Sequence, residues 1–384
     1  MAASLMELSH PMTRPKILYL TPTPIGDRSF GGAIRSNDLR VALCEVGDVD
    51  TLVLQGGPAF HIDADFGPEQ VKTLTYTARG LSWAGLRQRR RVRQCIGALL
   101  ERGDYRFIVA RYAGQADVVP RQAWDKLIVD PDDIHKNLNR ADGGVLARLR
   151  CSIRNAWVAR MLRRALHVWI VNPNDQVRLG AARSSLLSNV VAVPALGPAR
   201  EPPVAGRILM VGFFPHPPNA HGLRWFAESV LPSLQGKFAH AELHAIGKCP
   251  PDLAGELAGR VSVRGYVDDL AAEYAKAALV IAPIFSGAGS QIKVIDALAH
   301  ARPLVATRFA TEGFSAHLHD GEHLRVAGDD ASDWIAACTA LLQNPEKSEA
   351  MAARAREKVA KCFGVSSMVV AVRQTLTALE TNRR

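Results

Sequence analysis

Short apolar runs alternate with longer stretches of helical periodicity along the first half of the chain. The apolar runs that we expect to form buried strands are 16–21, 49–54, 106–110, 126–129 and 167–171. Helical periodicity covers 33–45 and 143–166, whereas the stretch between 54 and 106 is more polar and less regular. This alternation predicts a parallel sheet with helices on both faces.

The same alternation restarts after residue 200. Strands are expected at 207–211, 241–246, 261–263, 278–282 and 303–306. Helices are expected at 222–234, 292–299, 331–343 and 346–361, with a last one from 366. Three prolines within 197–203 predict a linker between the two halves. We therefore predict two α/β domains, 1–200 and 201–365, and a C-terminal helix in 366–384 that packs back toward the first domain.

Composition adds one asymmetry to this picture. Hydrophobic residues make up 48% of the 384 residues, enough for a core in each half. There is no apolar run of the length that spans a membrane, no secretory leader and no CxxC pair among six scattered cysteines, so we expect a cytoplasmic protein with reduced thiols. Residues 1–200 hold 28 Lys and Arg against 18 Asp and Glu, whereas residues 201–384 hold 19 of each. The excess positive charge therefore belongs to the first half.

A loop of small residues joins the expected strand 278–282 to the expected helix 292–299. Small residues let the backbone approach a ligand, and the first turn of a helix offers unpaired N–H groups, so this arrangement favours a phosphate site. Lys293 would add a charge to the same site, and Asp296 could accept hydrogen bonds from two ribose hydroxyls. Loop composition alone leaves open the alternative of a glycine-rich turn with an exposed lysine and a capping aspartate.

Several segments of the second half resemble family 4 glycosyltransferases. The stretch from Pro283 to Thr307 is similar to the donor-site signature of one subgroup, P-x-x-x-G-x-G-T-[RK]-[IL]-K-[VIL]-[LI]-E-A-[LM]-A-x-G-x-P-V-V-A-T. Val211-Gly-Phe-Phe-Pro-His-Pro-Pro-Asn219 resembles the first strand and loop of its donor domain. Gly265-Tyr-Val-Asp-Asp-Leu270 and Thr311-Glu-Gly313 resemble two further segments, so the resemblance covers about residues 205–362.

The resemblance implies a GT-B fold of two Rossmann-like domains with parallel sheets facing across a cleft. It also implies a retaining transfer of a sugar from a nucleotide-diphosphate sugar to an acceptor hydroxyl, with the leaving phosphate taking the acceptor's proton. Lys293 and Asp296 would be the catalytic residues, and the main chain at Tyr266 and Val267 would bind the base. The remaining residues expected to bind the donor are Gly31, Gly32, Gly212, Ser286, Gly287, Gly289, Ser290, Gln291 and Ile292.

The resemblance in the first half is looser. Gly31-Gly-Ala-Ile-Arg35 resembles a glycine-containing loop that faces the donor phosphates, and Asp130 lies at an acidic strand end seen in relatives. Arg35, Arg111 and Asp130 are therefore expected on the acceptor side.

Three positions depart from the family pattern. Asp296 stands where the motif has Glu, and Gln291 stands where Arg or Lys is common. Ala288 occupies the place of an earlier Glu that the subgroup also lacks. The first two departures weaken the expectation of turnover more than the expectation of fold.

We expect no cofactor and no metal, because a helix terminus and Lys293 already serve the diphosphate. Asp130, Asp132 and Asp133 imitate the metal-binding triplet of a different glycosyltransferase fold and form the alternative. Two other functions stay open: a non-catalytic subunit that binds nucleotide sugars, and a sugar-nucleotide epimerase or phosphorylase on the same double fold.

The densest positive charge lies between Arg87 and Arg93, directly after Leu81, Trp83 and Leu86. A solvated helix face is one interpretation, and weak contact with an anionic membrane through Leu81–Arg93 is the other. Nucleic-acid binding is not expected, since no RNA- or DNA-binding motif accompanies the charge. The expected partners are a nucleotide sugar and a glycan or lipid-linked acceptor. With the membrane contact, the protein is expected at the inner face of the membrane.

Overall fold

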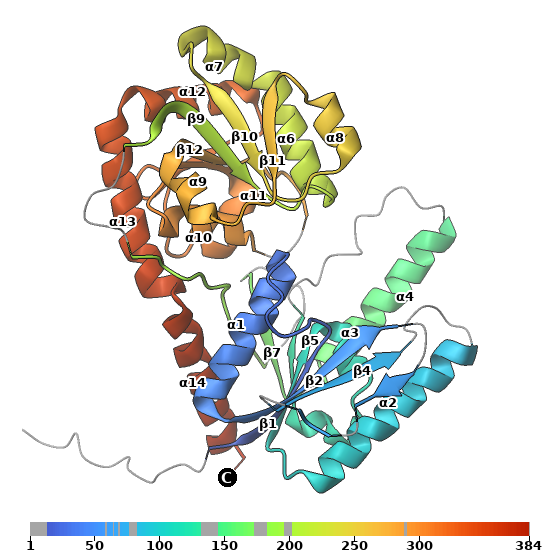
Figure 1. Cartoon of the computed structure of the whole chain (residues 1–384). Helices are drawn as coiled ribbons and strands as arrows, with labels where there is room; N and C mark the ends of the chain where they lie inside the picture. Colours follow the sequence, from blue (N-terminus) through green and yellow to red (C-terminus); the bar gives the residue numbers. More distant parts are fainter. Residues whose placement is uncertain are drawn as a thin grey trace, which may run out of the picture.

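The structure is a computed structural model that describes residues 14–57, 60–63, 65–67, 70–76, 83–131, 145–172, 183–195, 202–287 and 290–383. Of residues 83–84 and 145–151, only the backbone is described. Two α/β domains lie one above the other in Figure 1, each built on one sheet. The boundaries that the sequence predicts for the two domains fall at a segment, 196–201, that lies outside the described residues.

The N-terminal sheet has eight strands in the order β3-β4-β2-β1-β5-β6-β7-β8. Its strands are β1 (Lys16–Thr21), β2 (Asp48–Gly56), β3 (His61–Ile62), β4 (Val71–Tyr76), β5 (Phe107–Arg111), β6 (Leu127–Asp130), β7 (His167–Ile170) and β8 (Ser184–Leu186). Neighbouring strands pair in parallel, except that β3 pairs antiparallel to β4. The central strands are continuous apolar runs because helices cover both of their faces.

Two groups of helices cover this sheet. One face carries α2 (Trp83–Arg102), α3 (Tyr112–Asp117) and α4 (Val145–Leu162), whose Val92, Ala116 and Met161 share a core with the sheet. A 3-10 helix, η2 (Arg121–Lys126), leads into β6. The other face carries α1 (Gly31–Val46), where Leu39 and Leu43 are buried.

The C-terminal sheet has six parallel strands in the order β11-β10-β9-β12-β13-β14. They are β9 (Val204–Val211), β10 (Glu242–Ile246), β11 (Val261–Gly265), β12 (Ala277–Ala282), β13 (Leu304–Thr307) and β14 (Arg325–Ala327). Its helices are α6 (Pro217–Ser229), α7 (Leu231–Lys237), α8 (Pro251–Glu256), α9 (Leu270–Lys276), α10 (Ile292–Ala299), α11 (Arg308–Thr311), η3 (Glu312–Phe314), α12 (Ala331–Gln343) and α13 (Pro345–Phe363). One core cluster runs through this domain.

The last helix, α14 (Val365–Thr381), returns to the N-terminal domain. The break after α13 falls at Gly364, and α14 then packs beside α1 (Figure 1). Met368, Val372 and Leu376 are buried in the same cluster as the α1 side chains. The Trp169 indole also donates to the Thr375 hydroxyl over 3.3 Å. The C-terminal segment therefore ties the two domains together along one side.

Most elements agree with the sequence pattern, and the differences have physical reasons. The expected helix 222–234 is two helices, because Pro232 occupies the first turn of α7 and cannot continue the preceding hydrogen-bond ladder. The polar stretch after residue 56 contains β4, which the pattern does not predict, and α2, which it leaves open as one interpretation of Arg87–Arg93. β4 alternates half-buried and buried positions, and α2 carries many arginines, so neither shows a long apolar run.

Candidate functional site

The order of the strands places the candidate site. In each sheet the strand order reverses beside the first strand, between β1 and β5 in one domain and between β9 and β12 in the other. Ligands of open parallel sheets bind outside the carboxyl ends of the strands at such a reversal. The loops that leave these ends run into α1, α6 and α10.

The N-termini of α1 and α10 lie against each other across the two domains. A methyl group placed on Gly31 would lie 3.6 Å from Cδ1 of Ile292. The N-cap residues, Phe30 and Gln291, make no side-chain hydrogen bond to their helices, and neither first turn contains an acidic residue. Both helix ends thus keep N–H groups and a partial positive charge for an anion.

Gly32 has a separate, steric role in the same turn. A Cβ at this position would lie 2.3 Å from the Tyr112 hydroxyl, so no other residue fits without moving that ring. Tyr112 itself has a positive φ of 69°, which is uncommon for a residue with a side chain. Gly32 therefore allows α1 to begin close to the end of β5.

The loop between β12 and α10 is described up to Gly287 and again from Ser290. Gly287 has φ +133°, a backbone conformation that favours glycine, and packs near Pro218. Ser286 is exposed, and Ser290 is half-buried. Ala288 and Gly289 lie outside the described residues.

Lys293 lies in the first turn of α10 and points toward α6. Its Nζ donates to Oδ1 of Asn219 over 2.5 Å, and Asn219 in turn donates to the Phe213 carbonyl over 2.8 Å. Gly212 lies beside Asn219, with a distance of 3.5 Å from an added Cβ to the amide. Burial lowers the pKa of Lys293 to about 7. An anion bound beside Lys293 would stabilise its charged form, which burial disfavours.

Asp296 lies one turn further along α10. One of its oxygens, Oδ2, accepts a hydrogen bond from the Tyr274 hydroxyl over 2.9 Å, while Oδ1 lies 4.0 Å from Nε2 of His300. Tyr274 stacks on His300, with ring centroids 4.5 Å apart. Burial raises the pKa of Asp296, against the lowering effects of the Tyr274 hydrogen bond and the charge of Arg28. The side chain remains 23% exposed, so Oδ1 can still meet a ligand.

The loop after β11 reaches the other domain. Gly265 has φ +66°, and Tyr266 after it is 64% exposed while its hydroxyl donates to the Ser29 carbonyl over 2.8 Å. Val267 packs against the core of the C-terminal domain. This turn follows the carboxyl end of β11, at the same edge of the sheet as the loop before α10.

Three residues expected on the acceptor side are placed elsewhere. Arg35, Arg111 and Asp130 are fully buried in the N-terminal domain, with exposures of 1%, 0% and 0%. Arg35 forms a two-pronged ion pair with Asp130 at 2.9 and 3.0 Å, and Arg111 lies 3.5 Å from the same carboxylate. These side chains do not reach an accessible surface in this structure, so their interpretation as acceptor contacts is corrected to a structural one.

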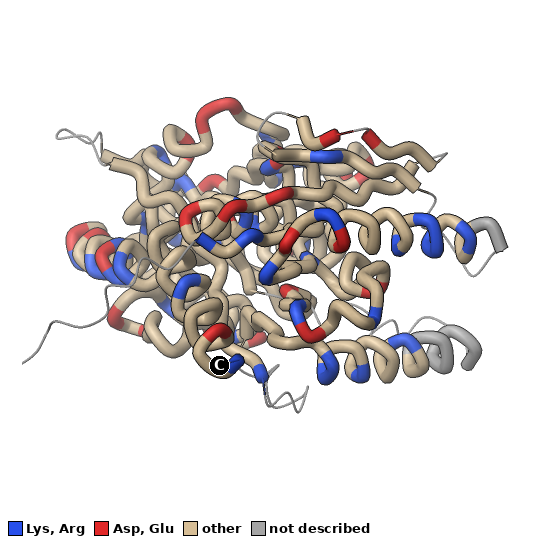
Figure 2. The backbone as a smooth tube through the Cα atoms, turned by 90° about the horizontal axis from the view of Figure 1, so that it is seen from below, with Lys and Arg blue, Asp and Glu red and all other residues tan. Residues whose placement is uncertain are grey.

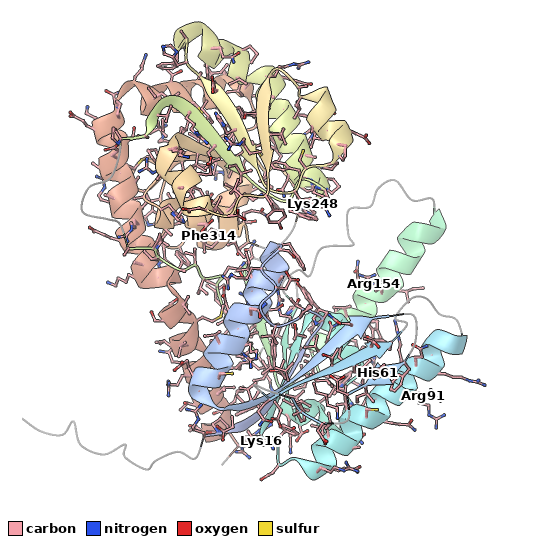
Figure 3. The ribbon with its side chains drawn as sticks, viewed as in Figure 1. Lys16, His61, Arg91, Arg154, Lys248 and Phe314 are labelled. Atoms are coloured by element: carbon pink, nitrogen blue, oxygen red, sulfur yellow. The ribbon has the colours of Figure 1, made fainter. Side chains whose placement is uncertain are left out.

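Sequence reasoning also missed side chains that the structure brings to the site. Asn219 lies in the first turn of α6, at the end of the segment that resembles the family, but nothing in its residue type marked it. Tyr274 and Asn189 come from segments without any motif, and only the fold brings them near α10. Lys248 follows β10 on the side that faces the N-terminal domain (Figure 3).

No three His, Cys, Asp or Glu side chains among the described residues could hold a metal ion together. Asp132 and Asp133 lie outside the described residues. Among the described helices, none has the length and apolar character needed to cross a membrane.

Comparisons with known proteins agree with the geometry. Solved structures establish the fold as the GT-B type: sucrose-phosphate synthase from Thermosynechococcus elongatus has a TM-score of 0.71 at 16% identity, covering 96% of this chain and 100% of that chain. A glycosyltransferase from Rickettsia africae gives 0.68 at 12% identity, covering 96% and 99%, and Anabaena HepE, solved with UDP and glucose, gives 0.66 at 14% identity, covering 95% and 100%. The predicted fold class is therefore confirmed.

Within this fold, residues 205–344 match the model of the family described as Glycosyl transferases group 1. The matched region contains β9 through α12 and therefore the whole C-terminal side of the candidate site. No curated protein matches the chain.

Proposed function

We propose that the protein is a retaining glycosyltransferase that moves a sugar from a nucleotide-diphosphate sugar to an acceptor hydroxyl. The observation that carries the proposal is the meeting of two uncapped helix N-termini, of α1 and α10, beside Lys293. They meet where both strand orders reverse, within a domain that matches a glycosyltransferase family. Such a site suits a diphosphate leaving group.

The residues of the candidate site would each have a separate role in this reaction. The N–H groups at the start of α10 and the Lys293 ammonium would stabilise the charge that develops on the leaving diphosphate. The Oδ1 atom of Asp296 would accept from the ribose, with Tyr274 holding the other oxygen. The Tyr266–Val267 main chain would meet the base. The leaving phosphate would accept the proton of the acceptor hydroxyl, so no protein nucleophile is required.

A donor panel tests this proposal directly. UDP is the first nucleotide to try, because HepE was solved with it. A ligand that binds only the folded state raises the unfolding midpoint, so a thermal-shift screen of nucleoside diphosphates identifies the base. Slow hydrolysis of the matching nucleotide sugar, detected as released nucleoside diphosphate, separates an enzyme from a non-catalytic binding subunit. Release of an epimerised or phosphorylated sugar would instead favour the epimerase or phosphorylase alternative.

Metal independence is part of the proposal. Lys293 and a helix terminus provide the positive charge that a divalent ion supplies in other transferases. We expect hydrolysis and transfer to survive EDTA with the rate changed less than about twofold. Complete loss of activity on chelation, restored by manganese or magnesium, would contradict metal independence. It would favour the acidic segment around Asp130 as a metal site.

We further propose that the acceptor is presented at an anionic membrane surface. Helices α2 and α4 pack on the same face of the N-terminal sheet and project on one side, with Lys and Arg along them (Figures 1 and 2). Their exposed apolar side chains are Leu86, Ile153 and Trp157, at 46%, 62% and 37% exposure. Arg91 lies on α2 and Arg154 on α4 (Figure 3). Exposed aromatic and apolar groups among arginines can sit at the level of lipid headgroups.

The proposed surface uses only part of the expected segment Leu81–Arg93. Leu81 lies outside the described residues, and only the backbone of Trp83 is described. Arg89 and Arg93 lie 3.6 and 3.9 Å from the Asp117 carboxylate, so part of their charge is already compensated. The surface therefore extends to α4, which the sequence did not single out.

Flotation with liposomes tests the membrane proposal. Binding should rise with the fraction of anionic lipid and fall with salt, since each basic residue near such a surface contributes about 1 kcal/mol. Substitution of Arg90, Arg91 and Arg154 by Glu should abolish it, whereas the same change at Arg121, on η2, serves as a matched control. A wild-type protein that stays unbound at low salt would leave a soluble glycan or small molecule as the acceptor.

A further inference from the structure

Asn189 lies just after β8, at the junction of the two domains, and its amide joins both of them. The side chain is buried, with the residue 2% exposed. Its Oδ1 accepts from Nη1 of Arg35 over 3.0 Å, within the N-terminal domain. Its Nδ2 donates to the Ser290 hydroxyl over 2.6 Å, in the loop directly before α10. One amide therefore bridges a buried ion pair and the candidate diphosphate site.

The orientation of this amide is fixed by charge. Asp130 holds the Arg35 guanidinium through two hydrogen bonds, and Arg35 also donates to the Leu187 carbonyl over 2.9 Å. A guanidinium only donates, so Asn189 must turn its oxygen toward Arg35 and its NH₂ group toward Ser290. A flipped amide would set two donors against each other in a buried place.

Ser290 is confined on its other side as well. A Cβ on Gly313 would lie 2.7 Å from the Ser290 Cβ, so the glycine leaves just enough room for the serine. With one lone pair of its oxygen taken by the Asn189 amide, the hydroxyl proton is free to point away from Asn189. The N-cap of α10, Gln291, is the next residue, and Lys293 follows in the first turn.

We propose that Asn189 is a positioning residue that makes the Ser290 hydroxyl a hydrogen-bond donor to the donor diphosphate. The proposal rests on the proposed function. It adds a side chain of the N-terminal domain, Asn189, that acts on the C-terminal half of the site, in addition to the start of α1. The diphosphate then binds tightly only when the two domains are joined, since Asn189 belongs to one and Ser290 to the other. Tyr266 and Ser29, and Asn172 and Glu312, link the domains beside it, at 2.8 and 3.1 Å.

Asn189→Asp is the sharpest variant, because Asp has nearly the same shape and still accepts from Arg35. Its carboxylate cannot donate, so Ser290 would have to donate to it and could then offer only lone pairs to a phosphate. We expect UDP to bind roughly tenfold or more weakly, the size of one hydrogen bond to a charged group, with uridine affinity unchanged. Ser290→Ala should weaken UDP binding to a similar degree.

The double variant separates positioning from simple charge repulsion. If Asn189 acts through Ser290, Asn189→Asp should change UDP affinity less than about twofold in the Ser290→Ala background. An equally large loss in that background would mean that the new carboxylate repels the diphosphate directly, and it would overturn the proposal. Thermal unfolding of each variant, and its uridine affinity, show that the fold and the base site are intact.

The same titrations distinguish this inference from the proposed function. Wild-type protein that binds UDP or another nucleoside diphosphate, with Asn189→Asp binding equally well, would remove Asn189 from the site and leave the proposed function standing. Wild-type protein that binds no nucleoside diphosphate would overturn both.

Discussion

In both domains the strand order reverses beside the first strand, but the polar residues at the strand ends are used in opposite ways. In the C-terminal domain Lys293 and Asp296 are partly buried, and each keeps capacity for a ligand. In the N-terminal domain Arg35, Arg111 and Asp130 are fully buried and form ion pairs with one another. The net positive charge of the chain lies in residues 1–200, the half that contains this buried cluster.

Charged residues at equivalent strand ends can therefore serve different purposes in the two domains. A buried ion pair fixes the arrangement of β5, β6 and α1, whereas a half-buried lysine at a helix terminus is poised for an anion. In the proposed function, donor recognition would then depend on the starts of α1 and α10 and on Lys293, close to the buried ion pair of the N-terminal domain. Substitutions in the two regions should therefore separate stability from binding.

The largest expected effect is on stability, in the N-terminal domain. Asp130→Ala should lower the free energy of unfolding by about 3–5 kcal/mol, because it leaves two buried guanidinium groups without their counter-charge. Chemical denaturation measures this loss. Asp125→Ala, on the surface 3-10 helix η2, is the control and should change stability by less than about 0.5 kcal/mol. Similar stabilities for the two variants would show that the buried ion pairs of Asp130 do not stabilise the domain.

The sequence predicts the C-terminal domain better than the N-terminal one, for physical reasons. The bounds of α10 and α12 agree with prediction, because their apolar positions repeat at helical spacing beside strands buried on both faces. In the first domain, β4 and α2 pack only one face on the core, so their polar positions hide the pattern. Asn189 could not be predicted at all, since its role depends on a contact with a residue 101 positions away.

The second effect is on donor binding. Lys293→Met should weaken UDP binding by roughly 1.5–3 kcal/mol, the size of a charge-assisted contact, while the protein stays folded. Calorimetric titration gives the affinity. Lys276→Met, on α9 and half exposed beside Glu273, is the matched control. Unchanged UDP affinity in Lys293→Met would remove the lysine from the site.

A smaller effect is expected at Asp296. Asp296→Ala should weaken binding of UDP more than of the 2′,3′-dideoxy analogue, because the role proposed for the carboxylate is acceptance from ribose hydroxyls. We expect about a tenfold loss for UDP, within the range of a hydrogen bond to a charged group. Asp296→Glu should retain most of the affinity. Equal losses for the two nucleotides would assign Asp296 to holding Tyr274 rather than to the ligand.

The smallest effect is a pH dependence that distinguishes the two regions without any substitution. Burial lowers the pKa of Lys293 to about 7 in the free protein, and a bound diphosphate favours the charged form and raises that pKa. Binding therefore takes up a proton above pH 7, so UDP affinity should fall as the pH rises from 7 to 8.5, by up to about tenfold per unit. The window lies above the second ionisation of a terminal phosphate, near 6, so the nucleotide keeps a constant charge. In Lys293→Met the affinity should be lower and flat over the same window. A wild-type affinity that does not change between pH 7 and 8.5 would mean that Lys293 is fully charged before the ligand binds. The contrast between a lysine available to an anion and the paired arginines of the N-terminal domain would then lose its support.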